Sequence, residues 1–165
     1  MTAGQEGLTD FDRMVAELQS RVLEQARELY SARVIEEAYN PKNVGRMADS
    51  DARGVVHGWC GDTMEFYLRM NGERIGKATF MTDGCGPTIA CGSMLTTMVR
   101  GMSLEEAGEF RSMDLIEALG GLPEESLHCA ELAVRTLRAA LQTVSGRVAT
   151  MRTVRTTRNG NEERE

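Results

Sequence analysis

The chain has 165 residues, 41% hydrophobic and 27% charged, which is long enough for one domain with a substantial core. Its net charge of −6 and its 5% aromatic content favour neither a nucleic-acid nor an anionic membrane partner. No stretch approaches the ~18 apolar residues of a membrane-spanning helix, and the first residues do not resemble a secretory leader. We therefore expect a cytoplasmic protein. In that compartment its four cysteines would more often be free, metal-bound or catalytic than paired in disulfides.

The first half of the chain predicts one long helix and then three short strands. Residues 1–8 are expected to form a flexible N-terminus, and apolar residues at helical spacing predict a long amphipathic helix over 9–37. Pro41 follows shortly and would end it. Strands are expected at 54–58, 63–70 and 73–82, the second with a clear alternation of apolar and polar residues. Between the last two, Asn71-Gly72 predicts a hairpin turn, with a bulge near Gly76.

The second half of the chain is predicted to be helical. Pro87 suits the first turn of a helix over 87–100, and Ser103 with Glu106 forms a capping-box pattern before a short helix. A further short helix is expected over 112–119 and a long last helix from Leu127, followed by a disordered charged tail at 148–165. Together these elements predict a single α+β domain over 9–147, with a small three-stranded antiparallel sheet packed against several helices.

Three of the four cysteines are predicted at the ends of these elements, where loops converge on one edge. Cys60 lies between two strand candidates, Cys85 between a strand and a helix, and Cys129 at the start of the last helix. Asp62 and His128 lie next to two of these thiols. Such a set is sufficient for a four-coordinate metal or a [2Fe-2S] cluster. The spacing alone supports a shared metal site and scattered small core cysteines equally well.

Four segments carry a resemblance to a known family. They are NPKNVG (40–45), CGD.M (60–64), GCG…A…S (84–93) and LP…LHC..LA (122–133). In this order, and over about residues 28–145, the chain resembles the IscU/NifU N-terminal type of iron–sulfur cluster assembly scaffold. The resemblance implies a small antiparallel sheet flanked by helices, in agreement with the elements predicted above.

The resemblance also implies roles for individual residues. Cys60, Cys85 and Cys129 match the three cluster-binding and sulfur-accepting cysteines of that family. Asp62 matches an aspartate that takes part in metal binding and keeps the cluster labile, and His128 matches an alternative ligand in zinc-bound or cluster-bound forms. Either of these two residues could supply the fourth ligand.

The function implied is that of a carrier rather than an enzyme. Such a scaffold accepts sulfur from a cysteine desulfurase, binds iron, builds a transient [2Fe-2S] cluster and passes it to apo iron–sulfur proteins or carriers. Zinc could occupy the same residues in the protein as isolated. Two alternatives remain open: a zinc-dependent sulfur acceptor similar to the SufU branch of the superfamily, and a structural zinc domain that serves as an interaction module.

Some residues depart from the family pattern or stand beside the site. Cys91 replaces a small residue and is predicted to be a core thiol, with an auxiliary role in sulfur handling as the alternative. His57 is expected to be an ordinary strand-end histidine and Trp59 a packing or shielding residue. LPEES (122–126) lacks the sequence that a dedicated Hsp70-type chaperone reads, so that partner is not predicted. The long N-terminal helix could support a homo-oligomer.

Overall fold

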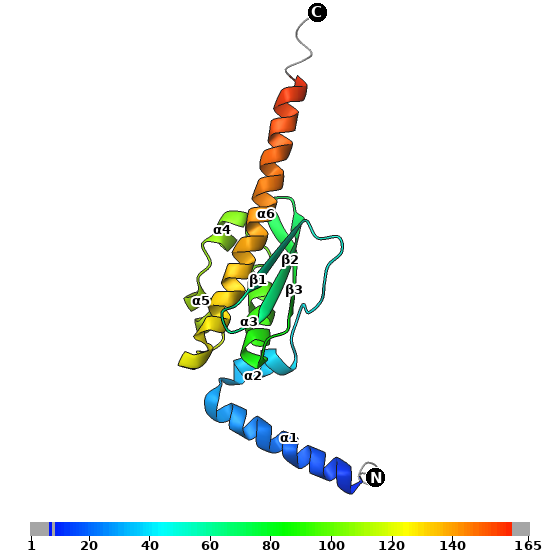
Figure 1. The fold of residues 1–165 in the computed structure, drawn as a ribbon, viewed down its shortest axis with the longest axis vertical. Helices are drawn as coiled ribbons and strands as arrows, with labels where there is room; N and C mark the ends of the chain where they lie inside the picture. The colour runs from blue at the N-terminus through cyan, green and yellow to red at the C-terminus, as the bar shows by residue number, and fades with distance from the viewer. Residues whose placement is uncertain (1–6, 8, 160–165) are drawn as a thin grey trace, which may run out of the picture.

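The computed structural model describes Gly7 and residues 9–159, with side chains described as far as Gly146. Ten elements follow one another along the chain (Figure 1). They are α1 (Asp10–Leu29), α2 (Ala32–Tyr39), β1 (Ala52–His57), β2 (Thr63–Asn71), β3 (Arg74–Thr82), α3 (Gly86–Met98), α4 (Leu104–Gly108), α5 (Ser112–Ala118), the 3-10 helix η1 (Glu124–Ser126) and α6 (Leu127–Asn159). Among these residues no helix is long and apolar enough to cross a membrane.

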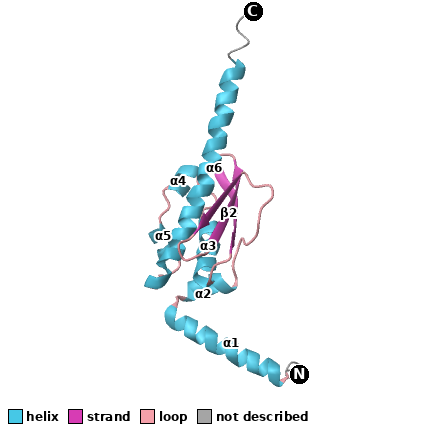
Figure 2. Cartoon of the chain, in the orientation of Figure 1, coloured by secondary structure: helices cyan, strands magenta, loops and turns pink. Residues whose placement is uncertain are grey.

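The sheet is antiparallel, in the order β1-β2-β3, and this confirms the predicted α+β class. Helices α3 and α6 pack against it, and the two short helices α4 and α5 lie along α6 (Figure 2). The expected alternation in β2 is present at Met64, Phe66 and Leu68, which are all fully buried, but Tyr67 on the opposite face is buried as well and Met70 is only partly covered. The core therefore lies between the sheet and the two long central helices.

The hairpin between β2 and β3 has the predicted turn and the predicted bulge. Gly72 has a φ of 62°, which a residue without a Cβ adopts at little cost. The register places Arg69 opposite Lys77 but Met70 opposite Ile75, so Gly76 is the extra residue on β3.

Helix α3 runs through the middle of the protein and is buried over most of its length. A Cβ placed on Gly92 would lie 2.4 Å from a ring carbon of Phe80, so only glycine allows β3 to approach this closely. Cys91, the neighbouring residue, is fully buried in the core, as predicted for a packing thiol. The fixed position of α3 matters because Cys85 stands directly at its N-terminus.

The single helix expected over 9–37 is wrong, because the structure divides it into α1 and α2. Ser31 begins the second helix: its hydroxyl accepts from the Val34 N–H and donates to the Leu119 carbonyl. The chain turns at Tyr30, and α1 then extends away from the rest of the protein (Figure 1). The same hydroxyl thus combines a local helix cap with a contact to a residue 88 positions away.

The disorder expected for the tail is also wrong over most of that segment. Helix α6 continues from the core to Asn159, and Figure 1 shows its last turns beyond the sheet. Residues 147–159 contain neither proline nor glycine, so nothing in the sequence ends a helix that the core has already started. Residues 160–165 lie outside the described residues, as do residues 1–6 and 8 of the expected flexible N-terminus.

Candidate functional site

Three thiols lie on three segments at one end of the sheet. Cys60 is in the loop between β1 and β2, Cys85 is the N-cap residue of α3, and Cys129 is the third residue of α6. The register pairs His57 with Thr63 and places Thr82 opposite Met64. The loop after β1 and the end of β3 therefore meet at the same sheet edge.

The β1–β2 loop is a compact turn that fixes the position of Asp62. The Gly58 N–H donates to the Asp62 carbonyl at 2.7 Å, and the Gly61 N–H donates to the Gly58 carbonyl at 3.1 Å. Gly61 has a φ of 95°, a conformation that favours glycine. His57, the last residue of β1, does not take part in this turn. Its Nδ1 lies 2.8 Å from the hydroxyl of Thr63, the first residue of β2, so the side chain bridges the two strands.

A threonine that the sequence analysis did not single out connects two of the thiols with the carboxylate. The Thr88 hydroxyl lies 3.1 Å from Asp62 Oδ2, 3.3 Å from Cys129 Sγ and 3.5 Å from Cys85 Sγ. Thr88 is fully buried in the first turn of α3. A hydroxyl has one proton, so it donates to either Asp62 or Cys129 and accepts from a thiol S–H. The only sequence signal for it is its position three residues after Cys85, one helical turn along α3.

Gly84 makes this close arrangement of side chains feasible. A Cβ placed there would lie 2.7 Å from Asp62 Oδ2 and 2.7 Å from Thr88 Cγ2. Asp62 thus reaches the beginning of α3 only because residue 84 has no side chain. Packing therefore explains the glycine before Cys85, whereas a Cβ on Gly86, the glycine after it, would make only an ordinary contact at 3.8 Å.

The thiols differ in exposure and therefore in acidity. Cys60 and Cys85 are exposed, whereas Cys129 is only 1% exposed. Burial is the largest cause that raises the pKa of Cys129, to about 11, and the neighbouring thiols Cys85 and Cys60 raise it further, against the hydrogen bond from Thr88. Burial also raises the pKa of Cys91 well above its ordinary value. At neutral pH both buried thiols are protonated in this structure.

His128 lies between the buried thiol and an exposed indole. Its Nε2 is 3.6 Å from Cys129 Sγ, and the centre of its ring is 4.9 Å from that of Trp59. Trp59 is 79% exposed and is the only tryptophan of the chain. It covers one side of the imidazole and is otherwise open to solvent.

The five residues predicted for the site differ in how closely they contact one another. Asp62, Cys85 and Cys129 are joined through Thr88, and His128 contacts Cys129. Cys60 lies outside the hydrogen bonds of Thr88, although it is near enough to affect the pKa of Cys129. Within the described part of the chain, no three His, Cys, Asp or Glu side chains are arranged closely enough to hold a metal ion. Binding of a metal by these residues would require side-chain rotation.

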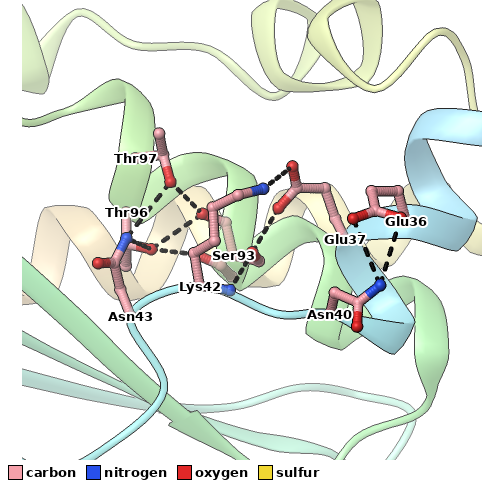
Figure 3. Close-up of polar contacts among 9 residues, drawn as sticks. Glu36, Glu37, Asn40, Lys42, Asn43, Ser93, Thr96 and Thr97 are labelled. Carbon is pink, nitrogen blue, oxygen red and sulfur yellow. Dashed lines mark hydrogen bonds and ion pairs between the residues drawn. The ribbon is translucent and has the colours of Figure 1, made fainter.

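A buried carboxylate holds the loop that follows α2 against α3 (Figure 3). Glu37 is 2% exposed and accepts hydrogen bonds from the Ser93 hydroxyl and, at 2.6 Å, from Lys42 Nζ, while Ser93 Oγ accepts from the Lys42 backbone N–H. Burial opposes its ionisation most strongly, but the bonds from Lys42 and Ser93 outweigh it and lower the pKa of Glu37. In the same loop, the Asn43 amide donates to the Thr96 hydroxyl at 3.2 Å.

Comparison with known proteins assigns the chain to a family. Residues 29–151 match the model of the NifU-like N terminal domain, so the chain belongs to that family. Among its relatives is the iron-sulfur cluster assembly scaffold protein IscU 1 of Archaeoglobus fulgidus, 41% identical over 114 residues. That match covers 68% of this chain and 74% of the relative. The scaffold protein IscU of Aquifex aeolicus is 39% identical over 116 residues, with the same two coverages.

A solved structure supports the fold independently of sequence. The N-terminal NifU-like protein of Brucella abortus matches with a TM-score of 0.57 at 21% identity, over 72% of this chain and 95% of that one. The family match begins at residue 29, so α1 lies almost wholly outside it.

Proposed function

We propose that this protein is a scaffold on which an iron–sulfur cluster is assembled and from which the cluster is passed to other proteins. The observation that carries the proposal is the convergence of three thiols and one carboxylate from separate segments at a single edge, within a chain of this family. Relatives named as cluster assembly scaffolds support the same function. In this role the protein is a carrier of iron and sulfur, not an enzyme.

Cys60, Cys85 and Cys129, with Asp62 or His128, are the proposed ligands of a [2Fe-2S] cluster. Thiolates are the usual ligands of such clusters. A carboxylate is a harder and weaker ligand for iron, so its presence in place of a fourth thiolate favours release. The same donor set also suits zinc, which could occupy the site when iron and sulfur are absent.

The sulfur would come from a cysteine desulfurase. A thiolate of the scaffold attacks the outer sulfur of the donor's persulfide, the S–S bond breaks, and the donor's cysteine leaves as a thiolate. Cys60 and Cys85 are exposed and suit this step, whereas the buried and protonated Cys129 does not. Cys129 would then join as a ligand once iron is present, because a metal deprotonates a coordinating thiol.

Anaerobic reconstitution tests the proposal. Ferrous iron, cysteine, a cysteine desulfurase and dithiothreitol are added to the wild type, Cys129→Ala and Cys91→Ala. Four electrons reduce two persulfide sulfurs to sulfide: two come from the two ferrous ions, which become ferric in the cluster, and two come from dithiothreitol. We expect a [2Fe-2S] absorption spectrum with matching iron and sulfide in the wild type and Cys91→Ala, and its loss in Cys129→Ala. Transfer to an apo-ferredoxin completes the evidence. If zinc stays bound, no chromophore forms and the desulfurase is still stimulated, the protein is a zinc-dependent sulfur acceptor instead.

Asp62 is the proposed source of cluster lability. Asp62→Ala should make the bound cluster persist or slow its transfer to the apo-ferredoxin, measured as the decay of the scaffold spectrum. Unchanged transfer kinetics in this variant would remove Asp62 from that role.

A further inference from the structure

Helix α1 is the least covered element of the described chain. None of its 20 residues is buried. Five of its large apolar side chains are half or more exposed, namely Phe11 66%, Met14 50%, Leu18 53%, Val22 54% and Leu29 60%, whereas Val15 and Leu23 are partly covered. Its neighbour is α2, and Figure 1 shows it projecting away from the sheet. Helices in proteins owe most of their stability to the packing of an apolar face, so an uncovered apolar stripe along α1 indicates a partner.

The apolar residues follow the pattern of a coiled-coil seam. Phe11, Val15, Leu18, Val22, Gln25 and Leu29 are separated by alternating steps of four and three residues. This places Val15, Val22 and Leu29 at heptad positions a, and Phe11, Leu18 and Gln25 at positions d. Such a narrow stripe fits another helix better than the broad surface of a globular domain.

We propose that α1 pairs with α1 of a second copy of this chain as a short, parallel, two-stranded coiled coil. Valine at two a positions, together with Leu18 at one of the three d positions, favours two parallel strands. In a parallel pair in register, Gln25 at position d lies opposite Gln25 of the second copy, and the two amides can hydrogen-bond to each other. Because α1 lies outside the family match, this pairing is a property of this chain and is independent of the function proposed above.

The charges beside the seam agree with the parallel arrangement. In the parallel pair, Arg21 at position g lies beside Ala26 at position e of the second copy. In the same way, Met14 at position g lies beside Gln19 at position e. No like charges oppose each other. In an antiparallel pair with full overlap, Arg21 would lie opposite Arg21 of the second copy, an arrangement that is destabilising.

The pairing would also bring the two thiol-bearing ends near each other. The end of α1 is attached next to the site, since Tyr30 Oη lies 3.4 Å from Ser126 Oγ, two residues before His128. The Ser31 hydroxyl donates to the Leu119 carbonyl in the same region. In a parallel pair both of these ends lie side by side, so the two copies present their sites from adjacent positions.

Sedimentation velocity of the full chain under reducing conditions, over a range of concentrations, tests the pairing. We expect a reversible monomer–dimer equilibrium for the wild type. Leu18→Glu puts a charge into the seam and should weaken the dimer by about 100-fold or more. The matched control Ser20→Glu adds the same charge on the outer face of α1, at position f, and should change the dissociation constant by less than about twofold. Unchanged thermal unfolding of the Leu18→Glu monomer would show that the domain stays folded.

A third variant tests the orientation. Ala26→Glu would face Arg21 of the second copy in the parallel pair and tighten the dimer, whereas in the antiparallel pair it would face Asp12 and weaken it. A weaker dimer would refute the parallel arrangement. A wild type that stays monomeric at several hundred micromolar, or equal effects of Leu18→Glu and Ser20→Glu, would refute the pairing and assign the stripe to a different partner.

Discussion

The reactivity of the four thiols should follow their burial in the metal-free protein. A pulse of iodoacetamide at pH 7.5 modifies thiolates, so its rate at each cysteine reports both exposure and acidity. Cys60 and Cys85 are exposed, and Cys129 and Cys91 are buried. We therefore expect Cys60 and Cys85 to react first, Cys129 much more slowly, and Cys91 only when the protein unfolds.

The magnitude for Cys129 follows from its pKa of about 11 against the ordinary thiol value of 9.0. Two units lower the thiolate fraction at pH 7.5 about 100-fold. A more basic thiolate is a better nucleophile, with a Brønsted coefficient of about 0.4–0.5, so the rate constant of the Cys129 thiolate is raised by a factor of roughly 6–10. Acidity alone therefore slows the reaction by about tenfold, and the 1% exposure of Cys129 slows it further.

Peptide mass spectrometry after quenching measures the rate at each cysteine, and a sample unfolded in urea serves as the control in which all four rates converge. The rate at Cys129 should rise about tenfold per pH unit up to pH 11. Thr88→Val removes the hydrogen bond that lowers the pKa of Cys129 and should slow the reaction, whereas Thr88→Ser keeps it. Modification of Cys129 at the same rate as Cys60 at pH 7.5 would refute this description of the site.

Three further predictions test the packing and the ion pairs. Gly54→Ala would place a Cβ 2.4 Å from the α6 backbone and should destabilise the fold by about 3 kcal/mol in urea unfolding, whereas Gly108→Ala, with open space around it, should not. Lys42→Ala leaves the buried carboxylate of Glu37 without its cation and should cost about 2 kcal/mol, less than a fully buried pair because Lys42 is half exposed. Hydrogen bonds from Tyr67 and two arginines lower the pKa of Glu65 to about 2. The ionised carboxylate should stabilise the fold by about 1 kcal/mol, because solvent screens the exposed arginines. This contribution should be present above pH 4.5 and lost as the pH falls towards 2. Glu65→Gln should therefore lower the free energy of unfolding at pH 7 and leave it unchanged at pH 2.

The parts of the fold that depend on local sequence could be predicted. Asn71-Gly72 specifies its hairpin through backbone conformation, and Ser103 with Glu106 forms the predicted capping box before α4. The alternation in β2 identifies its buried face. Each of these signals operates within a few residues and does not depend on the rest of the chain.

The break between α1 and α2 depends on a contact that the sequence pattern does not contain. Residues 10–39 contain neither proline nor glycine, so a single helix is a reasonable local solution. The structure departs from it because the Ser31 hydroxyl both caps α2 and reaches the Leu119 carbonyl. This division turns α2 onto α3 and leaves the stripe of α1 uncovered.

The site shows the same distinction between residue identity and arrangement. The motifs identify which side chains carry the chemistry, but exposure and protonation depend on how α3 and α6 pack. The burial of Cys129 beside Thr88 is a consequence of that packing. Because the Thr88 hydroxyl has one proton, it donates to Asp62 Oδ2 or to Cys129 Sγ but not to both at once. The packing of α3 therefore links two of the proposed ligands through one buried side chain that no motif identifies.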